Sequence, residues 1–89
     1  MVGAGQFGKN HCRVIGESER AELAAVADID PARGTLTDYR ELAGRVDAAV
    51  IAAPTSVHAE IGCFLLEAGI DVLVEKPVAP DLASADRLI

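Results

Sequence analysis

The chain is poor in aromatic residues and carries no excess of positive charge. Aromatics make up 3% of its 89 residues and tryptophan is absent, so any core must be built from aliphatic side chains. The chain contains eight Lys and Arg residues and 14 Asp and Glu residues, which gives a formal net charge of −6. Without a cluster of Lys and Arg, the chain lacks the electrostatic footprint of a protein that binds nucleic acid or an anionic membrane. A bound polyanion would therefore have to be held by backbone N–H groups.

Cysteine is also scarce. Cys12 and Cys63 stand alone, without the Cys or His spacing of a zinc site. Isolated cysteines in such a chain are typically small buried residues in a reducing compartment. The sequence shows no signal-peptide pattern, and its longest apolar run, 48–54, is far shorter than the roughly 20 residues that span a bilayer. We expect a soluble cytoplasmic protein.

Three short apolar runs, 23–27, 47–53 and 72–74, alternate with helical patterns. Continuous rather than alternating apolar runs are typical of parallel strands buried on both faces. Ile61, Phe64, Leu65 and Ala68 recur at helical spacing before Gly69, and a further helix is expected over 6–15. The pattern predicts an α/β fold with a Rossmann-like, doubly wound parallel sheet.

Helix starts are indicated by residues that can cap N-termini. Thr55 or Ser56 could cap the helix that carries Ile61, and Asp81 could cap a last helix with Leu82, Ala85, Leu88 and Ile89 on one face. Asp38 followed by Glu41 has the spacing of a capping box, before a short helix closed by Gly44.

The amino terminus carries the pattern G-x-G-x-x-G, formed by Gly3, Gly5 and Gly8 with Gln6 and Phe7 between them. The first glycine allows a tight turn, the second lets the backbone approach a pyrophosphate, and the third allows close packing of helix against strand. The following helix would direct its N–H groups and its dipole toward the phosphates. An acidic chain can hold an anionic dinucleotide in this way.

Asp28 ends the first apolar run, 23–27, about 20 positions after the glycine motif, where an acid meets the adenosine ribose hydroxyls. Its charge would repel a 2′-phosphate and favours NAD over NADP, whereas the nearby Arg33 could accept that phosphate. The alternative is that the glycines are only turn residues and that Asp28 caps a turn before Pro31.

Two polar segments follow the later strands. Glu75, Lys76 and Pro77 come directly after the run 72–74, at the edge where open α/β sheets bind ligands. A lysine there can move protons or donate to a substrate hydroxyl, although a solvated Glu-Lys pair is the plainer interpretation. His58 could contact a ligand or only cap or pack, and His11 is interpreted as a packing or locally hydrogen-bonded residue.

Together these residues resemble the N-terminal domain of the Gfo/Idh/MocA family, the glucose–fructose oxidoreductase and inositol dehydrogenase group. The Glu-Lys-Pro segment is the most specific feature, and the matching segments cover nearly the whole chain. They are Gly3–Gly8 with His11, 26–28, 38–42, 50–55 with His58, and 72–77.

The resemblance implies an NAD(P)-binding Rossmann domain of an oxidoreductase that moves a hydride between nicotinamide and a sugar, polyol or nucleotide-sugar. The segment from Pro54 to His58 resembles that of members acting on nucleotide-activated amino sugars. Lys76 is implied as a catalytic residue that aids proton transfer or positions substrate. The implied cofactor-binding residues are Gly3, Gly5, Gln6, Phe7, Gly8, Asp28, Ala53, Pro54, Thr55, His58, Glu75, Lys76 and Pro77.

The chain departs from the family pattern in three places. Only Met1 and Val2 precede Gly3, too few for a first strand, and the segment from Asp28 to Asp38 is too short for a helix plus a third strand. The family's substrate and dimerisation domain is missing, so residues 1–89 are expected to be a partial Rossmann domain without turnover. Unpaired neighbours of the first strand predict marginal folding or self-association through open edges.

Other functions remain open from the sequence. One is a non-catalytic dinucleotide-sensing module, for which Lys76 would be dispensable. The others are a two-domain reductase of an amino-acid pathway, which the Glu-Lys-Pro segment fits less well, and an inactive fragment.

Overall fold

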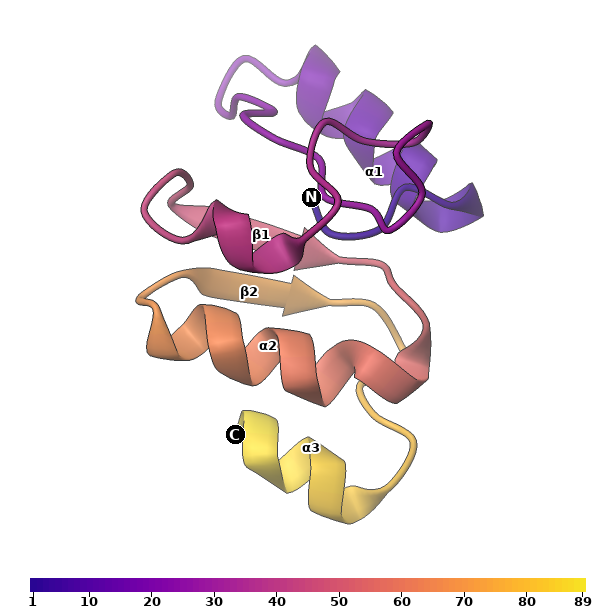
Figure 1. Ribbon diagram of the computed structural model, residues 1–89, viewed down its shortest axis with the longest axis vertical. Helices are drawn as coiled ribbons and strands as arrows, with labels where there is room; N and C mark the ends of the chain where they lie inside the picture. The colour runs from indigo at the N-terminus through magenta and orange to yellow at the C-terminus, as the bar shows by residue number, and fades with distance from the viewer.

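The computed structural model describes residues 1–89, and its centre is a parallel pair of strands joined by a helix (Figure 1). Strand β1, Ala48–Ile51, pairs with β2, Asp71–Val74, in a register that places Ala48 opposite Asp71. Helix α2, His58–Glu67, connects them and ends before Gly69, whose φ is +81°. The predicted second and third strands of the sequence pattern and the helix between them are therefore confirmed.

Single-residue bridges extend this pair into a wider parallel arrangement. Val2 bridges both Ile51 and Ala27, and Ala27 bridges Leu36. The order across the sheet is thus Leu36, Ala27, Val2, β1 and β2. This is the doubly wound order of a Rossmann sheet, with its first three strands each reduced to one bridging residue.

Met1 and Val2 take the place of the first strand and form main-chain hydrogen bonds to both neighbouring segments. Val2 donates its N–H to the Val50 carbonyl at 2.8 Å and accepts from the Ala52 N–H at 2.8 Å. On the other side, Ala27 donates to the Met1 carbonyl at 2.8 Å. The expectation that the neighbouring segments lose their main-chain partner is wrong at these positions, because two residues suffice to bond both edges.

The segment 23–27 differs from expectation, whereas the stretch 29–35 contains no helix, as its length predicts. Only Ala27 of the predicted strand 23–27 is buried and bridged, and Ala24 is exposed. The chain then turns directly to Leu36, without a crossover helix, so that Leu36 takes the third-strand position.

Of the three helix starts at which the sequence predicts a capping residue, two have a side-chain cap. Asp81 accepts from the Ser84 N–H at 2.7 Å at the start of α3, Leu82–Leu88, as predicted. Asp38 accepts from the Arg40 N–H at 2.9 Å rather than forming a box with Glu41, and the element is a short 3₁₀ helix, η1, Tyr39–Leu42. The predicted cap at Thr55 or Ser56 is wrong, because α2 follows a 3₁₀ turn, η2, Thr55–Val57, with no side-chain cap.

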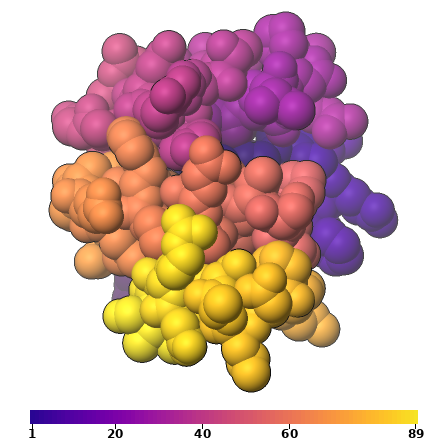
Figure 2. Space-filling model, turned by 60° about the horizontal axis from the view of Figure 1, so that its bottom comes forward, coloured from indigo at the N-terminus to yellow at the C-terminus, as the bar shows by residue number.

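Helices lie on both sides of the strands (Figure 1): α1, Gln6–Glu17, on one side, and α2 with α3 on the other. Figure 2 shows α3 seated on α2, where Leu88 rests against Gly62, a residue without a side chain to obstruct it. On the rest of the predicted apolar face of α3, Ala85 is half-buried, whereas Leu82 and Ile89 are exposed. The core is aliphatic and consists of Val2, Ala27, Leu42, Ala49, Ile51, Ile61, Leu65 and Ile70. None of the helices has the length and apolar character needed to cross a membrane.

Candidate functional site

The glycine loop between Val2 and α1 contains two glycines that the fold itself requires. Gly3 has a φ of +88°, and a Cβ there would lie 2.9 Å from the backbone of Ala52. A Cβ on Gly8 would collide with the Gly3 carbonyl oxygen, so the first turn of α1 can pack on the loop only through glycine. Their roles in the turn and in helix packing are those that the spacing predicts.

The packing of the fold does not require a glycine at position 5. It precedes α1 with a φ of −70°, which any residue can adopt, and the only atom within 4 Å of a Cβ there is a guanidinium nitrogen of Arg33 at 3.8 Å. The first N–H groups of α1 have no acceptors within the helix, and no side chain caps them. The loop therefore offers N–H donors and an open approach beside Gly5, which suits an anionic group.

Asp28 lies next to this loop and is fixed by two backbone donors. Its Oδ2 accepts from the Ala4 N–H at 2.7 Å and its Oδ1 from the Asp30 N–H at 2.9 Å. Burial raises the pKa of the Asp28 carboxyl, but these hydrogen bonds and the positive charge of Arg33 outweigh it, so that the pKa lies below its usual value. Asp28 is an ionised, oriented acceptor near neutral pH.

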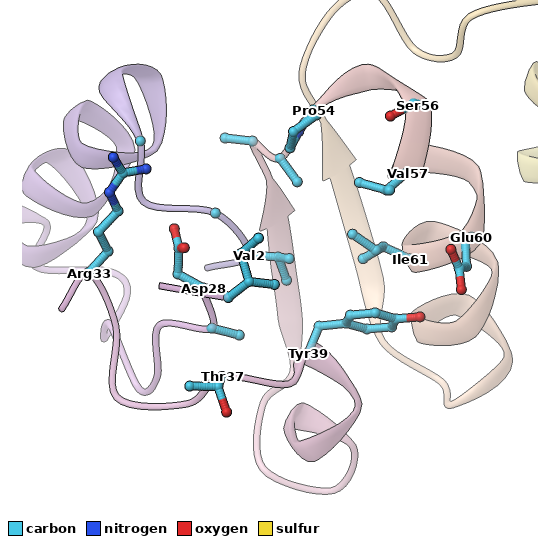
Figure 3. A pocket seen from close by; sticks show the side chains of 16 residues that line it. Val2, Asp28, Arg33, Thr37, Tyr39, Pro54, Ser56, Val57, Glu60 and Ile61 are labelled. Carbon is cyan, nitrogen blue, oxygen red and sulfur yellow. The ribbon is translucent and has the colours of Figure 1, made fainter. Parts of the chain in front are cut away.

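A cleft of about 560 Å³ opens beside Asp28 and the glycine loop (Figure 3). Gly3, Gly5, Arg33, Ala53 and Pro54 border it at the loop side. At its other end lie Thr37 before η1, Tyr39 of η1, Val57 of η2, and Glu60 and Ile61 of α2. The sequence gives this end no site role: Tyr39 lies in the family-like segment 38–42 without an assigned function, Glu60 lies in no motif, and the fold brings both to the same cleft.

A second cleft of about 350 Å³ adjoins the first and shares Ala52, Ala53 and Pro54 with it. Its remaining lining is formed by Phe7, Thr55, His58, Glu75 and Lys76. The two clefts together follow the carboxyl ends of Val2, β1 and β2, which is where open α/β sheets bind ligands. Predicted residues from four separate segments thus meet along one edge of the sheet.

His11 contributes to this edge in a way that the sequence did not indicate. Its Nε2 lies 2.8 Å from Oε1 of Glu75, which joins α1 to the end of β2. Both side chains are about one-third exposed, at 30% and 34%. The interaction is long-range rather than local, and it orients the Glu75 carboxylate beside Lys76.

His58, which the resemblance implies as a cofactor contact, borders the smaller cleft and makes hydrogen bonds within the chain. The side chain is buried, with Nε2 at 2.7 Å from the Ala53 carbonyl and Nδ1 at 3.1 and 3.2 Å from the Pro77 and Val78 carbonyls. Both ring nitrogens face acceptors of the chain itself. His58 therefore ties the end of β1 to the segment after Lys76, and it shapes the smaller cleft instead of presenting a free nitrogen to it.

Three further predicted residues border neither cleft. Gln6 is exposed on the first turn of α1, Gly8 is buried beneath the loop, and Pro77 is exposed after Lys76. Gly8 and Pro77 still act on the site indirectly, through loop packing and through the carbonyl that faces His58.

Comparison with known proteins decides the family. The model of an oxidoreductase family described as having an NAD-binding Rossmann fold, GFO_IDH_MocA, matches residues 1–89. The chain belongs to this family. An inositol 2-dehydrogenase of Renibacterium salmoninarum is 35% identical over 103 aligned positions, which cover 100% of this chain and 31% of that protein. The rhizopine catabolism protein MocA of Rhizobium meliloti is 34% identical over 86% of this chain and 28% of its own length.

Solved structures of relatives share the fold. A WlbA dehydrogenase of Bordetella pertussis, in complex with NADH and UDP-GlcNAcA, superposes with a TM-score of 0.91 at 28% identity, over 99% of this chain and 31% of that one. A scyllo-inositol dehydrogenase of Lactobacillus casei with bound NAD(H) and scyllo-inositol gives a TM-score of 0.90 at 25% identity, over 98% and 30%. The chain thus spans about 31% of the length of the relatives it matches.

Proposed function

We propose that this chain binds a nicotinamide adenine dinucleotide along the two adjoining clefts. The pyrophosphate would take the N–H groups beside Gly5 and at the start of α1, and the adenosine ribose would meet Asp28. The nicotinamide end would lie toward Glu75 and Lys76, with Ala53, Pro54 and Thr55 between. The observation that carries this proposal is the open space at Gly5. Unlike Gly3 and Gly8, Gly5 has no main-chain atom within 4 Å of a Cβ, so the packing of the fold does not explain the glycine.

The charge at Asp28 supports NAD over NADP as the preferred cofactor. The lowered pKa keeps this carboxylate ionised, and a 2′-phosphate beside it would be repelled. Arg33 lines the same cleft but is already drawn toward Asp30, with its Nε 3.6 Å from Oδ2 of that residue. The opposing charges predict a preference for NAD, not an absolute exclusion of NADP.

We infer further that the domain serves an oxidoreductase acting on an inositol, a sugar or a nucleotide-sugar, as the substrates of its relatives indicate. When bound, the nicotinamide would exchange a hydride with a carbon that bears a hydroxyl. Lys76 lies at that end of the site and is exposed, so its side chain can reach a substrate hydroxyl and take part in moving its proton. Glu75, held by His11, would keep the neighbouring wall in place.

The proposal is tested by calorimetric titration of NADH into the chain and into a Gly5→Val variant. A Cβ at this position meets no main-chain atom, so the variant should keep the thermal unfolding temperature of the parent chain, while the valine side chain occupies the space beside the glycine loop and abolishes detectable binding. Gly16→Ala, where nothing lies within 4 Å, is the matched control and should bind NADH like the parent. NADPH should bind more weakly than NADH. Equal NADH affinity of Gly5→Val and the parent chain would contradict the proposed site.

A further inference from the structure

The start of α2 holds the only buried residue of the chain that has a polar side chain. His58 is 1% exposed, and its ring lies between two segments that leave the sheet. On one side, just after β1, the Ala53 carbonyl oxygen lies 2.7 Å from Nε2. On the other side, the segment from β2 to α3 passes the start of α2 (Figure 1), and its Pro77 and Val78 carbonyl oxygens lie 3.1 and 3.2 Å from Nδ1. The hydrogen-bonding partners of the ring are therefore three carbonyl oxygens, which can only accept.

These partners determine how many protons the ring needs. A neutral imidazole has one N–H and one nitrogen with a lone pair, whichever tautomer it adopts. In either tautomer the lone pair would face a carbonyl oxygen at hydrogen-bond distance, and a buried polar atom without a partner is costly. An imidazolium has an N–H on both nitrogens and can donate on both sides. The separation of 2.7 Å at Nε2 is also typical of a charged donor.

No acidic side chain pairs with this ring. None of the salt bridges in the chain involves His58. Glu75 lines the same cleft but is paired with His11, and Glu60 on the first turn of α2 is exposed and borders the larger cleft. Lys76 is the one cation that lines the same cleft, and it is exposed to solvent. The groups that stabilise a positive charge on the ring are thus main-chain carbonyls.

We propose that His58 is a positioning residue for Lys76 and that it acts as an imidazolium, whose two N–H groups join the main chain after β1 to the main chain after Lys76. Ala53 and Lys76 both line the smaller cleft, so the double contact sets the distance between its walls. Loss of one proton removes one of the two contacts. The inference rests on the proposed dinucleotide site for its effect on binding. Because the protonated ring completes the cleft, affinity for the nicotinamide part is full at low pH and falls as rising pH removes the proton.

The protonation state is read in the free chain from the ring ¹⁵N resonances of its two histidines. His11→Gln assigns these resonances, because it removes one of the two rings. At about pH 7 both nitrogens of His58 should carry a proton, as in an imidazolium. A His58 nitrogen without a proton at that pH would overturn the proposal, whether or not the chain binds a cofactor.

The effect on binding is measured by calorimetric titration of NADH and of ADP-ribose, which lacks the nicotinamide ring, between about pH 6 and about pH 9. The parent chain is compared with His58→Gln, whose side-chain amide does not titrate in this range. With rising pH the parent should lose about three- to tenfold more NADH affinity than the variant, which is the effect of losing one hydrogen bond. For ADP-ribose the two chains should differ by less than about twofold, since this ligand ends before the nicotinamide.

The parent chain also provides a measurement that does not depend on the folding of the variant. Its ratio of NADH affinity to ADP-ribose affinity should fall over the same pH range. A constant ratio, or the same pH dependence of NADH binding in the parent and in His58→Gln, would overturn the positioning role while leaving the dinucleotide site intact. Failure of the parent chain to bind NADH at all would instead overturn the proposed function.

Discussion

The two halves of the sheet are held together by different means. Between β1 and β2 a four-residue parallel ladder is covered by α2, which buries Ile61 and Leu65. From Val2 to Leu36 the connections are single bridges, and the contacts depend on main-chain hydrogen bonds and on glycines that let segments approach closely. The first region is stabilised by side-chain packing. The second is shaped by backbone geometry, and it presents the loop and the acid of the candidate site.

This difference suggests how stability and binding are distributed. Side-chain packing contributes most of the free energy of folding, whereas loops that bind ligands are drawn from the less stable parts of a protein. We therefore expect substitutions in the α2 region to change the free energy of unfolding most. Substitutions around the glycine loop should change binding as well as stability.

The largest effect is expected at Leu65, which is fully buried on α2. Leu65→Ala removes apolar contacts and leaves a cavity, which typically costs about 2–5 kcal/mol of the free energy of unfolding. The neighbouring Leu66→Ala is the matched control, because Leu66 is 40% exposed and should lose much less. Urea denaturation measures both, and similar losses in the two variants would contradict the packing of α2 described here.

A smaller loss is expected at Gly8 in the amino-terminal half. Gly8→Ala places a Cβ against the Gly3 carbonyl oxygen, a backbone atom that cannot rotate away. Overpacking of this kind typically costs about 1–3 kcal/mol. Because the glycine loop must shift to relieve the contact, NADH binding should weaken together with stability. Unchanged denaturation and unchanged binding in this variant would show that α1 does not pack on the loop as described.

The smallest effect, and one of opposite sign, is expected at Gly16 on the same helix. Nothing lies within 4 Å of a Cβ there, so Gly16→Ala only raises helix propensity. This should add up to about 1 kcal/mol to the free energy of unfolding. The same urea series checks it, and a loss instead of a gain would mean that the end of α1 is packed more tightly than in this structure.

The sequence predicted the parts of the fold that carry a local pattern. The glycine motif, Asp28, β1, α2 and β2 follow from spacing and periodicity within a few residues. The bridging roles of Val2 and Leu36 could not be predicted, because a single parallel bridge leaves no periodicity in the sequence. The continuous apolar run predicts a buried strand over 23–27, but the turn after Ala27 leaves only one of its residues in the sheet.

In the candidate site, too, the sequence predicts the motif residues but not the contacts between distant segments. Its motif residues lie along one edge, as expected for the carboxyl ends of parallel strands. The hydrogen-bond partners of the two histidines could not be predicted from the sequence, because they are distant along the chain. His11 pairs with Glu75, 64 positions away, and His58 with the Pro77 carbonyl, 19 positions away. The places of Tyr39 and Glu60 in the cleft could not be predicted, because only the folded sheet brings η1 and α2 to the same cleft.

The most direct test of the dinucleotide site is a map of amide chemical shifts during titration with ADP and with NADH. Both should perturb the amides of 3–8 and Asp28, because both carry the adenosine and pyrophosphate groups assigned to the amino-terminal half. NADH alone should also perturb Glu75 and Lys76, where the smaller cleft would hold the nicotinamide. Shifts confined to other regions, or the same pattern for both ligands, would contradict a cofactor lying across the two clefts.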